Sequence, residues 1–144
     1  MMIFALHPML QLGAILIALF AFSLGLKRFL ALHLGKTVRF DWKKHVLAGK
    51  LAISLLSLGY LLGIGIIWYR FKTVALFTIH FEIATAMLPL LFFGLLSGAY
   101  MDRRKKRRKV LNLVHGLNNT LVLLLCLGQL VVGGRLLRLL FLGY

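Results

Sequence analysis

Four long apolar segments, separated by short polar connections, account for almost the whole chain. Each is about as long as the roughly 20 residues that a helix needs to cross the hydrocarbon core of a bilayer. They cover Phe4–Leu26, His45–Trp68, Thr73–Met101 and Val110–Gly133. Because the connections are short, consecutive helices should run antiparallel. We predict an all-α, integral membrane, up-and-down four-helix bundle.

Residues 1–144 are therefore expected to form a single membrane domain. After the fourth span, the stretch Arg135–Tyr144 mixes basic and apolar residues. That composition predicts a short tail lying at the membrane interface.

The composition agrees with a membrane protein. Of the 144 residues, 61% are hydrophobic, and only Asp41, Glu82 and Asp102 are acidic. A soluble domain of this size could not cover so much apolar surface. The net charge of +15 suggests nucleic acid as a partner, but the basic residues are sorted by connection rather than spread over one surface. We therefore exclude a nucleic-acid partner.

Two connections hold thirteen of the 18 basic residues. They are Lys27, Arg28, Lys36, Arg39, Lys43 and Lys44 between the first two spans, and the run from Arg103 to Lys109 between the last two. Short loops rich in lysine and arginine stay cytoplasmic, so both termini should face outward. The same loops are expected to contact anionic membrane lipid.

Each apolar segment carries one histidine near its N-terminal end: His7, His45, His80 and His115. Because the helices alternate in direction, His7 and His80 should lie toward one membrane face, and His45 and His115 toward the other. A histidine within a membrane is costly unless it finds a partner. For a single histidine, a hydrogen bond to a neighbouring helix explains it, but four at matched depths favour a cofactor. His33 is expected in the basic loop, without a role.

Two pairs at two depths are what two haems require. Haem iron takes only two ligands from the protein, one on each face, and parallel helices can supply one imidazole each. Zinc or copper usually gathers three or four ligands. Cys126, the only cysteine, excludes covalent haem attachment through two thiols. We predict two haem b groups with bis-histidine ligation.

Residues near these histidines are candidates for contact with the cofactor. Small ones can admit a flat macrocycle, although close helix packing alone is the commoner explanation. The polar ones can bind a propionate or merely a neighbouring helix. The candidates are Gln11, Gly49, Lys50, Ala84, Gly116 and Asn119.

Glu82 is the one acidic residue expected within a span. Two hypotheses stand equally: an interfacial ion pair with Arg70 or Lys72, and a role in carrying a proton coupled to reduction.

The residues around the histidines resemble those of a known family. His7-Pro8-Met9-Leu10 resembles the start of the first core helix in the cytochrome b561 family of transmembrane electron carriers. Lys44-His45, His80-Phe81-Glu82 and His115-Gly116 resemble its other ligand positions, in the same order. The resemblance implies that His7 pairs with His80, and His45 with His115. The chain also resembles a family of small four-helix membrane proteins of unknown function. That resemblance suits a bacterial inner membrane and implies haem binding at most.

The chain departs from the first family in having only the core four helices. It has no clear counterpart of that family's ascorbate-binding pattern, so ascorbate is not carried over as the donor. We expect a membrane cytochrome b that relays electrons across the bilayer, as a subunit or partner of a larger redox chain. Its redox partner would be a protein or a quinone, and quinone or ferric reductase activity is a variant. The alternative is a non-redox scaffold or small transporter whose histidines bridge helices. An oligomer is compatible with the sequence.

Overall fold

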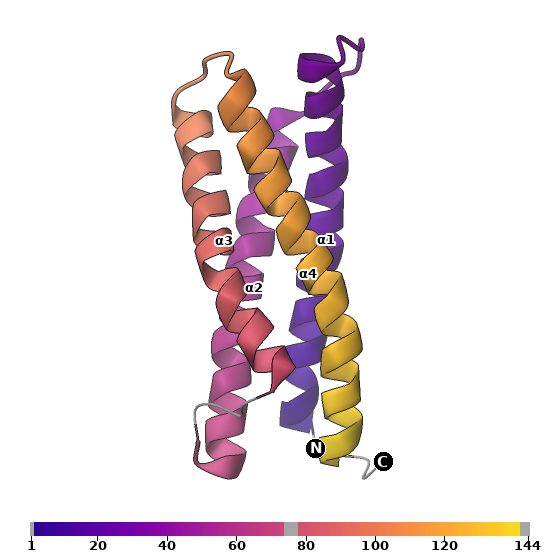
Figure 1. Cartoon of the computed structure of the whole chain (residues 1–144), viewed down its shortest axis with the longest axis vertical. Helices are drawn as coiled ribbons and strands as arrows, with labels where there is room; N and C mark the ends of the chain where they lie inside the picture. Colours follow the sequence, from indigo (N-terminus) through magenta and orange to yellow (C-terminus); the bar gives the residue numbers. More distant parts are fainter. Residues whose placement is uncertain (1, 74–77, 142–144) are drawn as a thin grey trace.

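The computed structural model describes residues 2–73 and 78–141, and over this part the chain forms four α-helices (Figure 1). They are α1 (Met2–His33), α2 (Trp42–Phe71), α3 (Ile79–Arg103) and α4 (Lys109–Phe141). Each is long and apolar enough to cross a membrane. The prediction of an all-α chain with four such helices is confirmed.

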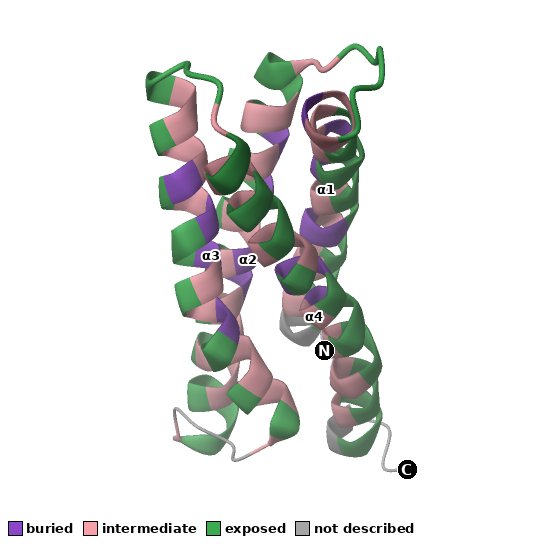
Figure 2. Cartoon of the chain, turned by 45° about the horizontal axis from the view of Figure 1, so that its top comes forward, coloured by how far each residue is buried: buried purple, intermediate pink, exposed green. Residues whose placement is uncertain are grey.

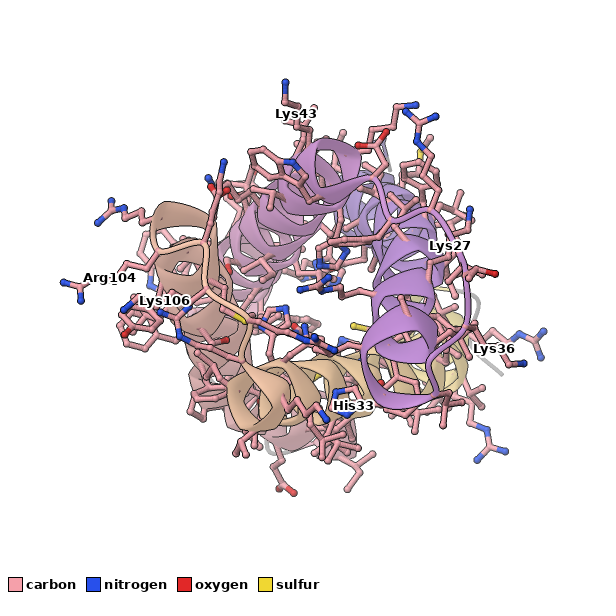
Figure 3. The ribbon with its side chains drawn as sticks, turned by 90° about the horizontal axis from the view of Figure 1, so that it is seen from above. Lys27, His33, Lys36, Lys43, Arg104 and Lys106 are labelled. Atoms are coloured by element: carbon pink, nitrogen blue, oxygen red, sulfur yellow. The ribbon has the colours of Figure 1, made fainter. Side chains whose placement is uncertain are left out.

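Consecutive helices run antiparallel and enclose a central space (Figures 1 and 3). Helix α1 packs against α2 and α4, and α3 packs against the same two helices. Consequently α1 faces α3 across one diagonal of the bundle, and α2 faces α4 across the other. The helices of each diagonal point in the same direction. Both termini lie at one end, and the two basic connections lie at the other (Figure 1).

Local interactions fix where α2 begins. Asp41 is its N-cap, and the Asp41 carboxylate accepts a hydrogen bond from the Lys44 backbone N–H at 3.1 Å. This bond lowers the pKa of Asp41. The Asp41 carbonyl accepts the N–H of His45 at 3.1 Å. The cap therefore places His45 in the first turn of α2, beside the basic end of the bundle.

Helices α1, α2 and α4 are longer than the sequence predicts. Helix α1 continues to His33, so placing His33 in the loop was wrong. It stops where Gly35, with φ at 64°, turns the chain and the Lys36 N–H donates back to the Leu30 carbonyl at 3.1 Å. The predicted first span ends at Leu26, directly before the basic residue Lys27. A lysine near the end of a membrane helix can, however, extend toward the interface without ending the helix.

The C-terminal part of the fourth segment also differs. Helix α4 runs through Gly133 and Gly134 to Phe141, so the helix extends beyond the predicted end of the fourth span, and the interfacial location of the tail stays a prediction. The rest of the predicted tail lies outside the described residues. Glycine pairs often end helices, but in an apolar helix they allow close approach of a neighbour.

Helix α3 begins later than its predicted start at Thr73. Its N-cap is Thr78, whose hydroxyl accepts the Phe81 N–H at 3.4 Å, and Thr73 lies outside any helix. A threonine cap explains the later start because it satisfies one of the free amides of the first turn.

The buried core lies midway along the bundle. Figure 2 shows buried positions facing inward and exposed positions around the outside. The core cluster consists of Ala14, Ile15, Leu56, Met87, Leu91, Val122, Leu123 and Cys126. Large apolar side chains such as Leu47 and Phe92, 69% and 62% exposed, cover the outer surface. An apolar exterior of this kind suits contact with another apolar phase.

Overfilling this core should destabilise the bundle. Ala14 has no exposed surface, so Ala14→Leu is expected to lower the free energy of unfolding by about 1–3 kcal/mol. Ala86→Leu adds the same atoms at an exposed position of α3 and serves as the control. Thermal unfolding in detergent, followed by circular dichroism, measures both. Equal stability of the two variants would contradict this location of the core.

Candidate functional site

The four histidines near the N-terminal ends of the helices meet in two pairs across the diagonals of the bundle. His7 on α1 faces His80 on α3, with ring centroids 6.1 Å apart. His45 on α2 faces His115 on α4, with centroids 6.3 Å apart. The ring planes cross at 83° and 74°. The structure thus brings together the same partners that the sequence pairs.

The two pairs occupy opposite ends of the bundle. His45 lies against Gly25 of α1, eighteen residues along that helix from His7. At 1.5 Å per residue, this spacing separates the two levels by about 27 Å. The core cluster lies between them. In the view down the bundle, the labelled lysine and arginine side chains point away from its middle (Figure 3).

A glycine on the adjacent helix lies behind each imidazole. A Cβ atom placed on that glycine would come within 2.9–3.2 Å of the ring's Cε1 atom, closer than side chains normally approach. The four contacts are His7 with Gly63, His45 with Gly25, His80 with Gly133, and His115 with Gly98. Each pair of antiparallel neighbours, α1 with α2 and α3 with α4, therefore exchanges two such contacts.

The same spacing recurs in all four helices. In each, the glycine stands eighteen residues after the histidine: Gly25 after His7, Gly63 after His45, Gly98 after His80, and Gly133 after His115. Eighteen residues make about five turns, so both lie on one face of the helix. From the sequence, Gly63 and Gly98 are expected to allow close helix packing or to leave room for a flat macrocycle, and Gly25 and Gly133 have no predicted role. This fourfold spacing is the signal that could have found them.

Three of the imidazoles are also oriented through Nδ1. His7 donates to the Gly59 carbonyl at 2.8 Å, and His45 donates to the Ala21 carbonyl at 2.9 Å. Since a carbonyl can only accept, Nδ1 carries the hydrogen in both. The neutral ring then keeps its lone pair on Nε2, the nitrogen available to a metal.

His115 is held by a hydroxyl. The Ser97 Oγ donates to the Phe93 carbonyl at 2.6 Å, so its oxygen can accept from His115 Nδ1 at 2.8 Å. Ser97 is buried and directly precedes Gly98, the glycine behind the same ring. Sequence reasoning gave it no orienting role, because helical spacing alone does not show which side chain meets which ring.

Amide side chains lie beside two of the histidines. The Gln11 amide packs against Gly59 and donates to the Leu56 carbonyl at 3.3 Å. The Asn119 amide packs against Gly94 and donates to the carbonyl of His115 at 2.8 Å. Both had been predicted as site residues, and both lie one turn after their histidine.

A cavity of about 290 Å³ adjoins the His7–His80 pair. Its size is close to the lower end of the range for small-molecule sites, about 300–1,000 Å³. Its lining is mostly apolar and includes Gln11, Tyr60, Ala84 and Gln129. Ala84 and Gln11 thus lie where the sequence predicts, whereas Gln129 was missed.

The remaining predicted contacts lie elsewhere or stand apart. Gly116 is exposed, and among the described residues no atom outside the adjoining turns of helix lies within 4 Å of the Cβ position of Gly116 or Gly49. Lys50 Nζ lies 3.5 Å from Asp102 Oδ2 and so links α2 to α3. His33 stacks on Phe29 at 5.0 Å and joins neither pair.

Glu82 is exposed in the first turn of α3 and forms no salt bridge within the described residues. The two cations proposed for it lie over aromatic rings instead: Arg70 over Phe71, and Lys72 over Trp68. The ion pair expected at this position is therefore not formed there.

Among the described residues, histidine, cysteine, aspartate and glutamate gather in no group of three or more that could hold a bare metal ion. Comparisons with protein-family models, with curated proteins and with solved structures found no match. Function is therefore inferred from the geometry of the two histidine pairs.

The glycine contacts lead to a test that needs no cofactor. Gly133→Ala would place a methyl group 2.9 Å from His80 Cε1, so we expect a loss of about 1–3 kcal/mol in stability from overpacking. Gly128→Ala on the same helix meets no atom and should cause no loss. Thermal unfolding of the two variants provides the comparison. If Gly133→Ala is as stable as Gly128→Ala, the close contact is wrong.

Proposed function

We propose that the protein is a membrane cytochrome b that binds two haem b groups and relays electrons between the two faces of a bilayer. His7 and His80 would hold the outer haem, and His45 and His115 the inner one. The assignment agrees with the resemblance to the cytochrome b561 family. The observation that carries it is the separation of the paired imidazoles across both diagonals.

That separation matches axial ligation of one metal ion by two imidazoles. Two metal–nitrogen bonds of about 2 Å, plus about 1 Å from each nitrogen to its ring centre, give about 6 Å between centroids. The two pairs measure 6.1 and 6.3 Å. Rotation about the metal–nitrogen axis leaves the angle between the ring planes free. Two protein ligands suffice only where four others come from a macrocycle, which favours haem over a bare ion.

The surroundings support the same proposal. His7 and His80 line the cavity, and Nδ1 of His7, His45 and His115 has a partner. Partners of this kind fix the ring orientation and raise the basicity of the coordinating nitrogen. The haem would supply one-electron chemistry at its iron, while the protein supplies ligands, a dry interior and electrostatics.

Nearby charge should give the two haems different reduction potentials. The connections near the His45–His115 end carry the basic runs, and positive charge favours the reduced, less positive iron. The reduction potential of the inner haem should therefore be raised. Salt and the haem propionates should weaken this increase. With two histidines to hold each haem, the protein would pass electrons to or from a partner protein or a quinone rather than bind a substrate at the iron.

One observation favours the alternative of a non-redox scaffold. Two of the histidines already donate to carbonyls of adjacent helices, at Gly59 and Ala21, as bridging residues would. A scaffold, however, needs no imidazole placed about 6 Å from a second imidazole across the bundle, as both pairs are. The two hypotheses differ in whether the protein binds haem.

Single histidine variants test the proposal. Wild-type protein should contain two haems per chain; His80→Ala should lose the outer haem alone, and His115→Ala the inner haem alone. His33→Ala should keep both, because His33 belongs to neither pair. Visible spectra and pyridine haemochrome assays measure the content. Colourless wild-type protein would support the scaffold, and loss of both haems from either variant would contradict the pairing.

The membrane orientation can be tested with introduced cysteines. In a Cys126→Ser background, Arg138→Cys should react with an impermeant maleimide on intact bacterial cells, and Lys36→Cys only after the cells are opened. The expectation follows from the basic loops, which should stay cytoplasmic. The reverse pattern of labelling would overturn the proposed orientation.

A further inference from the structure

His80 differs from the other three paired histidines. Its Nδ1 atom is buried and has no hydrogen-bond partner among the described residues. The same is true of the Oε1 atom of Gln129. These two residues are already joined, because Gln129 Nε2 donates to the His80 carbonyl at 2.7 Å. One unpartnered donor and one unpartnered acceptor therefore belong to residues in direct contact.

The position of Gln129 in its helix corresponds to that of the carbonyl acceptors used by His7 and His45. Ala21, which accepts from His45, stands four residues before Gly25; Gly59, which accepts from His7, stands four residues before Gly63. Gln129 stands four residues before Gly133, the glycine behind His80. At the His80 site, the residue four positions before the glycine therefore has a side-chain amide in addition to its backbone carbonyl.

We propose that Gln129 is the positioning residue for His80, an inference that rests on the proposed function. Its Nε2 keeps the bond to the His80 carbonyl, while its Oε1 accepts the Nδ1–H of the same residue. A primary amide can donate and accept at once, and its terminal torsion is soft. The two bonds direct His80 Nε2 toward His7 across the bundle.

This arrangement has an electronic consequence at the outer site. A hydrogen bond from Nδ1–H makes the imidazole a stronger donor through Nε2, which favours the oxidised iron and lowers the potential. The acceptors of His7 and His45 are backbone carbonyls and cannot be removed by substitution. Gln129 for His80 and Ser97 for His115 are side chains, so each pair has one ligand that can be tested separately.

Redox titration of the full chain tests the inference. The outer haem is identified as the component absent from His80→Ala. Gln129→Met removes both bonds at similar volume and should shift the outer potential to a more positive value. Gln129→Glu keeps an acceptor oxygen and should leave that potential at or below the wild-type value. Ser97→Ala should raise the inner potential alone.

The outcomes separate this inference from the proposed function. If the wild-type protein contains no haem, the proposed function is wrong. If haem is bound, loss of the outer haem alone from Gln129→Met, with Gln129→Glu retaining it, also supports the positioning role. The inference is overturned if Gln129→Met leaves the outer potential unchanged, if Gln129→Glu raises it equally, or if the inner haem shifts as much.

Discussion

The close approach of an imidazole to a glycine of the adjacent antiparallel helix is the contact on which the rest of the structure depends. It occurs once per helix, and it sets how near α1 lies to α2 and α3 to α4. Because one edge of each ring packs against this glycine, the opposite edge faces the helix across the diagonal of the bundle. Four such contacts at two levels leave two gaps of about the same width. A side chain in place of any of these glycines would push its ring into the gap.

The core, the apolar exterior and the placement of charge follow from enclosing the two spaces between paired imidazoles in an apolar bundle. The core cluster between them keeps the two levels apart, and apolar side chains cover the outside. Charge is confined to the ends, where Lys50 and Asp102 also join α2 to α3. Some polar groups inside the bundle are satisfied by neighbouring helices, as for Asn118, which donates to the Leu90 carbonyl at 3.0 Å. Buried amides without such partners would be costly in a medium that offers no water.

Much of this could be predicted from the sequence, because length and apolarity fix the number of helices, and alternating direction fixes which histidines share a level. The ends of helices were less predictable. Gly133-Gly134 suggested a boundary, whereas the absent side chain of Gly133 allows the contact with His80. Likewise, Gly116 was expected at the site because it adjoins His115, but neighbours in a helix point apart, and it faces outward. Ser97 and Gln129 were missed because their roles depend on how two helices are rotated against each other.

Anomalous diffraction at the iron absorption edge, from crystals of the purified protein, tests the central claim most directly. The proposed binding of two haems predicts two iron peaks per chain, one midway between His7 and His80 and one midway between His45 and His115. Diffraction from well-ordered crystals with no iron in either gap, or with iron bound elsewhere, would contradict it.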